Sequence, residues 1–132
     1  MTLDDLYTDV YRHLAENTKL INLLKGEKFF DYQPDESTAA PYVVIGDFYE
    51  QGGRLLNDTE REVELRLHIW TSQFGRFQNL DIKNAIVNDF IKYNNPDEQE
   101  YFFVNFILEH ELKDWVHGVL TLKTFIQKEI DN

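Results

Sequence analysis

Residues 62–70 alternate between polar and apolar side chains, and this pattern constrains the fold more than any other feature of the chain. Successive side chains of an extended strand point to opposite faces. One face is therefore apolar and carries Val63, Leu65, Leu67 and Ile69. The other is polar and carries Glu62, Glu64, Arg66 and His68. One buried and one polar face are typical of an antiparallel sheet with helices on a single side.

Two segments repeat apolar residues at the three- and four-residue steps of an amphipathic helix. The first runs from residue 3 to residue 16, with Thr2 as its N-cap, and a short helix restarts at Asn17 or Thr18. The second runs from about Arg76 to Tyr93. Its expected apolar stripe comprises Phe77, Leu80, Ile86, Val87, Phe90, Ile91 and Tyr93.

Four further segments are rich in β-branched and aromatic residues, which favour strands. They are residues 28–32, 42–49, 101–110 and 115–127. Residues 51–58 interrupt this pattern, and their Gly52–Gly53 pair predicts a loop because glycine loses much backbone entropy inside a strand. The order of elements predicts an α+β fold. An antiparallel sheet of about four to five strands packs against two main helices, in a single domain spanning residues 1–132.

The charge and the missing cysteines exclude several kinds of partner and cofactor. The chain has 24 acidic and 13 basic residues, a formal net charge of −11, which argues against tight binding of nucleic acid or anionic lipid. Without cysteine there is no disulfide, thiolate zinc site or iron–sulfur cluster. No apolar run approaches the roughly 18 residues of a membrane span.

The sequence contains no catalytic or metal-binding motif with a recognisable residue spacing. The four histidines form no pair at metal-ligand spacing, so each is expected to be exposed or hydrogen-bonded. The chain contains neither a Gly-x-Ser-x-Gly motif nor a phosphate-binding glycine loop. We therefore predict no catalytic, cofactor-binding or metal-ligating residue, and a protein that is not an enzyme. Two alternatives stay open: an acidic module that binds a basic protein, and a small hydrolase using carboxylates and a histidine.

Two segments are candidates for contacts between subunits. The aromatic segment 101–106 has no interleaved basic residues and is expected in the core or at a subunit interface. In the segment 51–60, two leucines lie among polar residues, either folding back onto the core or making an assembly contact. The candidate contact residues are Gln51, Gly52, Gly53, Arg54, Leu55, Leu56, Asn57 and Asp58.

Several short runs resemble the tail-completion, or head-to-tail joining, proteins of long-tailed bacteriophages and prophages. Residues 30–34 read Phe-Asp-Tyr-Gln-Pro, residues 41–47 Pro-Tyr-Val-Val-Ile-Gly-Asp and residues 117–120 His-Gly-Val-Leu. The alternating strand ends in His-Ile-Trp-Thr-Ser at residues 68–72. These are strand and core signatures rather than catalytic motifs, and the resemblance covers nearly the whole chain.

The resemblance implies a structural virion protein at the head–tail junction, made in the cytoplasm of a bacterial host. Family members close the tail tube as a homo-oligomeric ring, commonly of six subunits, that docks to the connector and lets DNA pass. Six copies with a formal charge of −11 each give the ring a formal charge of −66, so such a ring would repel DNA rather than bind it. The expected partners are further copies of the chain, the connector or adaptor protein and the tail-tube protein. The exposed sides of the sheet and residues 51–60 are the expected contacts.

Overall fold

The computed structural model describes residues 1–35, 37–52, 60–91, 98–111 and 115–127. Within these residues the chain forms three helices and a five-stranded sheet, in the element order that the sequence predicts. The expectation of an α+β fold is confirmed. No helix in these ranges is long and apolar enough to cross a membrane.

The helices are α1 (Leu3–Glu16), α2 (Thr18–Leu24) and α3 (Arg76–Ile91). Thr2 caps α1 as predicted: its hydroxyl accepts from the Asp5 backbone N–H, and the Asp5 carboxylate accepts from the Thr2 backbone N–H. The hydrogen bonds from Thr2, together with the charge of the N-terminal amine, lower the pKa of Asp5. Asn17 caps α2 in the same manner, its side-chain oxygen accepting from the Leu20 N–H.

The strands are β1 (Phe29–Phe30), β2 (Tyr42–Gly52), β3 (Glu60–Ser72), β4 (Tyr101–Glu111) and β5 (Trp115–Gln127). Their order across the sheet is β1-β2-β3-β5-β4. β3 and β5 lie at the centre and are paired antiparallel over thirteen residues each. The two-residue β1 runs parallel to β2, so the sheet is mixed rather than wholly antiparallel. Residues 31–41 connect the end of β1 to the beginning of β2, which is long enough to return along the strands and allow the parallel pair.

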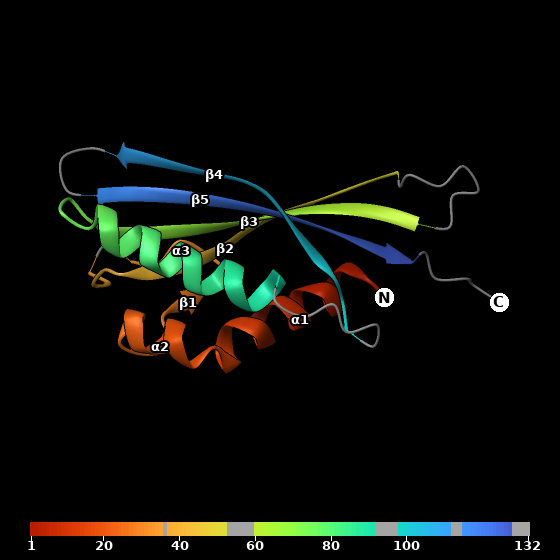
Figure 1. The fold of residues 1–132 in the computed structure, drawn as a ribbon, viewed down its shortest axis with the longest axis horizontal. Coiled ribbons are helices and arrows are strands. Elements are labelled where there is room, and N and C mark those ends of the chain that lie inside the picture. The colour runs from red at the N-terminus through yellow and green to blue at the C-terminus, as the bar shows by residue number, and fades with distance from the viewer. Residues whose placement is uncertain (36, 53–59, 92–97, 112–114, 128–132) are drawn as a thin grey trace.

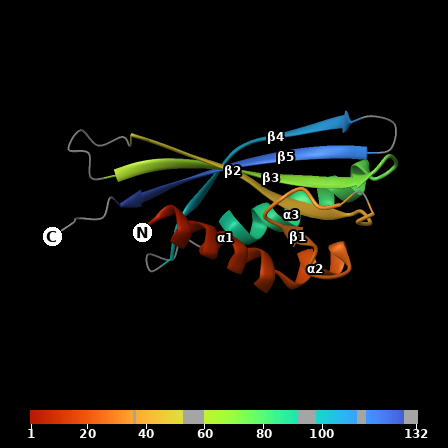
Figure 2. The same cartoon turned by 180° about the vertical axis from the view of Figure 1, so that it is seen from behind.

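All three helices lie on one side of the sheet, which leaves its other side open (Figures 1 and 2). We call these the helical face and the open face. The alternation of residues 62–70 is confirmed, because all four apolar side chains of that segment are fully buried on the helical face. They meet the apolar stripes of the helices in one continuous core that includes Leu6, Val10, Leu14, Leu20, Ile82 and Ile86.

Two details of the sequence prediction are wrong. Gln51 and Gly52 belong to β2 rather than to a loop, because the pairing with β3 continues to Gly52 opposite Arg61. The Gln51 side-chain amide donates to the Glu62 carboxylate across this pair. Phe77 is 79% exposed and Ile91 38% exposed, so neither belongs to the buried stripe of α3, and Tyr93 lies outside the described residues. The stripe follows Asn79, Ile82, Ile86 and Phe90, and Phe77 lies about 200° around the helix from Asn79.

The buried polar residue Asn79 fixes α3 on the sheet. Its amide nitrogen donates to the Ile69 carbonyl on β3 at 2.9 Å and to the Thr71 hydroxyl at 3.2 Å, and lies 3.4 Å from the Val116 carbonyl on β5. Gly118, opposite Ile69 in the ladder, leaves the space for this side chain. A Cβ at Gly118 would collide with the Asn79 side-chain oxygen and lie 2.8 Å from the Phe106 ring.

We therefore expect Gly118→Ala to lower the free energy of unfolding by about 2 kcal/mol, the usual scale for overpacking a tight core. Gly52→Ala is the matched control, because nothing lies within 4 Å of a Cβ at that position. The control should change stability by no more than about 0.5 kcal/mol. Urea unfolding followed by circular dichroism measures both, and equal effects of the two substitutions would contradict this account of α3 docking.

Candidate assembly surface

The edge strand β4 carries the largest group of exposed apolar side chains on the described part of the sheet. These are Phe102, Phe103, Val104 and Ile107, with Phe103 48% and Ile107 49% exposed. No charged residue occurs from 102 to 108, and β4 contains neither proline nor lysine. Soluble proteins usually protect an edge strand with such residues, because its unpaired backbone groups can accept another strand. The edge of β4 is therefore a surface suited to a partner strand.

A β-bulge lies at the middle of β4. The register with β5 shifts between Phe103 and Asn105, which leaves Val104 as an extra residue without a partner in the ladder. Residues 102, 105 and 107 face the open side, since they lie opposite open-face residues of β5. Phe103 and Phe106 face the helical side, where Phe106 packs against the core. The bulge thus distributes apolar side chains to both faces of this edge.

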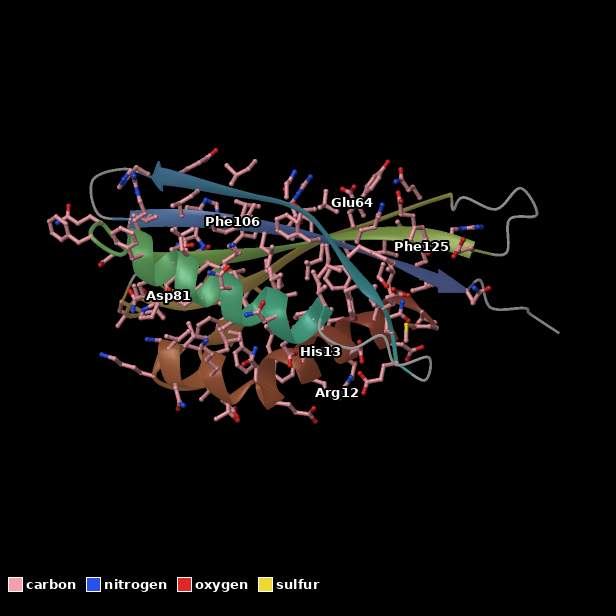
Figure 3. All side chains as sticks on the ribbon, viewed as in Figure 1. Arg12, His13, Glu64, Asp81, Phe106 and Phe125 are labelled. Carbon is pink, nitrogen blue, oxygen red and sulfur yellow. The ribbon has the colours of Figure 1, made fainter. Side chains whose placement is uncertain are left out.

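The opposite edge of the sheet is also partly free. β1 pairs with β2 at Val43 and Val44, so the segment 46–52 has only β3 as a neighbour within the described residues. Tyr49 is exposed on the open face of this segment. A hollow of about 360 Å³ lies beside it, lined by Asp47, Phe48, Tyr49, Glu64 and Arg66. Figure 3 shows Glu64 on the side of the sheet away from the helices.

Of the contact residues predicted from the sequence, the structure places Gln51 and Gly52 at the free end of β2, both exposed. Gly53, Arg54, Leu55, Leu56, Asn57 and Asp58 lie outside the described residues. The two that are described lie on the free β2 segment and therefore next to a candidate contact surface. Their role in assembly stays a prediction.

A second apolar surface lies at the turn between β3 and α3. Phe74 is 88% exposed and Phe77 79% exposed, and both lie at one end of the molecule. Between them in sequence, Arg76 contacts the imidazole of His110 at 2.7 Å, which ties this end of α3 to the end of β4. Two large exposed aromatic side chains next to each other are typical of a contact surface.

A buried polar cluster holds the beginning of β4 against α1 and α3. The Tyr101 hydroxyl donates to Asp9 at 2.7 Å, and His13 Nδ1 donates to Asp89 at 2.9 Å. The His13 ring stacks on Phe90 with centroids 4.5 Å apart. Burial and the Asp9 carboxylate both raise the pKa of Tyr101 far above its ordinary value, so its hydroxyl stays a donor. Figure 3 shows His13 and the neighbouring Arg12 on the helical layer.

Sequence reasoning missed a histidine pair on the open face. His68 Nδ1 and His117 Nε2 lie 2.7 Å apart, and the His117 ring stacks on Trp70 with centroids 3.9 Å apart. The two histidines are 49 positions apart, and only the pairing of β3 with β5 makes them neighbours. Burial and then the charge of His117 lower the pKa of His68.

A hollow of about 350 Å³ lies over this pair. Its lining includes Asp31, Gln33, Asp47, His68 and His117, but among the described lining residues there is no serine, threonine or cysteine that could act as a nucleophile. Across the described ranges, no three His, Asp or Glu side chains are grouped to hold a metal ion. Each imidazole contributes one nitrogen to the contact between the two rings. The contact therefore joins β3 to β5. All four histidines make a polar contact within the protein, as expected from their spacing.

Comparison with known proteins identifies a family and solved structures with a similar fold. Residues 8–127 match the family model described as "Tail completion protein gp17". A solved structure titled "Virion of native gene transfer agent (GTA) particle" contains a chain that is 16% identical, with a TM-score of 0.74. The alignment covers 92% of this chain and 93% of that chain, and at this identity it establishes the fold alone. No curated protein matches.

The His68–His117 pair predicts how stability depends on pH. The unfolded chain takes up the His68 proton near its ordinary pKa of about 6.5, whereas the folded protein takes it up only at lower pH. The unfolded state then binds more protons in this window, so the free energy of unfolding decreases as the pH falls below about 6.5. In His68→Gln this decrease should be smaller, as measured by urea unfolding from roughly pH 7 to pH 5. His110→Gln is the control, and an unaltered pH dependence in His68→Gln would contradict the assignment.

Proposed function

The chain belongs to the phage tail-completion family, and from this premise we propose that it closes the end of the tail tube as a ring that joins the tail to the head. The family consists of structural tail proteins, so the chain is a structural protein of a phage-type virion. The observation that carries the proposal is the family match over residues 8–127, which includes every described strand and both candidate contact surfaces. In this role the chain performs no catalysis.

The proposed ring consists of copies of this chain, most simply six, arranged head to tail. In such a ring one surface of each subunit meets a different surface of the next. Two free sheet edges on opposite sides of the molecule support this arrangement, because each subunit needs two unlike contact surfaces. A single isologous surface would give a dimer and could not close a ring of six.

The charge of the chain suits a conduit for DNA. Each phosphate contact to a basic surface adds affinity and would delay a moving duplex. Six copies at −11 each carry a formal charge of −66, which repels a polyanion at close range. We propose that DNA passes through the ring without binding it.

For docking to the connector and to the tail tube we propose the two rims of the ring. The end formed by Phe74 and Phe77 supports this because these are the two most exposed large apolar side chains among the described residues. It lies at one tip of the strands, beside the end of β4, where Arg76 contacts His110 (Figure 1). A ring closed through the edges would leave this tip available to a partner.

Addition of the purified chain to heads and tails from a phage that lacks it tests the function. We expect the chain to restore joined, infectious particles, as counted by electron microscopy and plaque assay. A tail-completion chain from an unrelated phage is the control for specificity. Normal binding to tails without any gain in joining would contradict the proposed role at the junction.

The double substitution Phe74→Ser/Phe77→Ser tests the docking rim. Both side chains are exposed, so we expect the variant to fold and to self-associate like the wild type. Its joining activity should fall at least tenfold because the apolar contact is lost. Tyr32→Ser, which removes an exposed aromatic side chain elsewhere, should keep full activity. Full joining by the double variant would exclude this end as the docking surface.

A further inference from the structure

We propose that the edge of β4 in one copy pairs with the free segment 46–52 of β2 in the next copy, so that the sheet continues from subunit to subunit. This inference rests on the proposed ring and names the surfaces that close it. The occupant of the β4 edge is a second copy of this chain, because the chain itself carries a matching free edge on the other side of its sheet.

The directions of the strands fit such a junction. From β2 through β3 and β5 to β4, each neighbour is antiparallel, so β4 runs opposite to β2. When copies are related by rotation about an axis along the strands, β2 of the next copy keeps its direction and lies antiparallel to β4. The junction then continues the alternation found inside each subunit. It also keeps the open face on the same side in every copy.

The side chains at the two edges also fit each other. Ile107 of β4 and Tyr49 of β2 both lie on the open face and both are exposed. The hollow of about 360 Å³ beside Tyr49 offers space for a side chain of the neighbouring copy. Two acidic copies approach most easily where charge is low, and residues 102–108 carry none. Burial of the exposed apolar surface at this edge attracts the two copies. This attraction must exceed the repulsion between the acidic subunits.

The chain contains no cysteine, which permits a direct test by single-cysteine cross-linking. Tyr49→Cys protein is mixed with Ile107→Cys protein that carries a size tag, and a short bis-maleimide reagent is added. The experiment is done at concentrations where the wild type associates, and again on tails that lack the protein. Lys19→Cys on the exposed surface of α2 replaces either partner in the control mixtures. Circular dichroism and urea unfolding confirm that each variant is folded.

We expect the mixture of Tyr49→Cys and Ile107→Cys to give a cross-linked heterodimer, at least tenfold more than either control mixture. Each variant alone should give only the background level. Efficient cross-linking of Ile107→Cys with itself would overturn the proposal, because it indicates a symmetric pairing of two β4 edges. The proposal would also be overturned if the mixture of Tyr49→Cys and Ile107→Cys gave no more cross-linked heterodimer than the control mixtures, both in solution and on tails.

The substitution Ile107→Lys separates this inference from the proposed function. It places a charge on the edge of β4 at an exposed position, and it should abolish both self-association and joining. If Ile107→Lys still forms rings and restores joining, the edge pairing is wrong while the function stands. If the wild type itself restores no joining, the function is wrong whatever the cross-links show.

Discussion

The thirteen-residue pairing of β3 with β5 is the constraint from which the rest of the structure follows. Strands of this length extend over about 40 Å, whereas α3, with sixteen residues, covers about 24 Å. One helix is therefore too short to bury the apolar face of the central pair. Figure 1 shows α3 beneath one half of the sheet and α1 towards the other. The order of elements, with α1 and α2 before the sheet and α3 within it, supplies both halves of this layer.

The helical layer is fixed to the sheet by polar contacts, because apolar packing alone does not specify a position along a long strand. Asn79 binds backbone groups of β3 next to Gly118, which fixes α3 at one height. Asp9 accepts from Tyr101, which fixes the beginning of β4 against α1. The Asn79 amide nitrogen and the Tyr101 hydroxyl each donate to a partner, and either group would be costly to bury without one. These contacts hold α3 on the central strands and the beginning of β4 against α1.

Patterns within short segments were readable from the sequence, and contacts between distant segments were not. The alternation of residues 62–70 predicted a strand with one buried face, and Thr2 predicted the beginning of α1. By contrast, the stripe of α3 was misplaced because Asn79, a polar residue, is buried in it and Phe77, an apolar residue, is exposed. The His68–His117 pair was missed because only the register of β3 with β5 brings the two residues together. The entropic cost of glycine in a strand predicted a loop at Gly52. The pairing of β2 with β3, which continues to this residue, could not be seen in the sequence.

The net charge of the chain limits which parts of its surface can contact another copy. A protein with a net charge of −11 repels its own copies, and salt screens this repulsion beyond about 8 Å, so it acts chiefly when two copies come close. Short-range attraction must then come from surfaces where carboxylates are few. Residues 102–108 form such a surface because they carry no charge, and the bulge at Val104 interrupts the strand at that one residue. An exposed apolar edge of this kind would make a monomeric protein prone to aggregation. In the proposed ring, pairing with the next copy covers this edge, while the acidic remainder of the surface opposes contact between copies elsewhere.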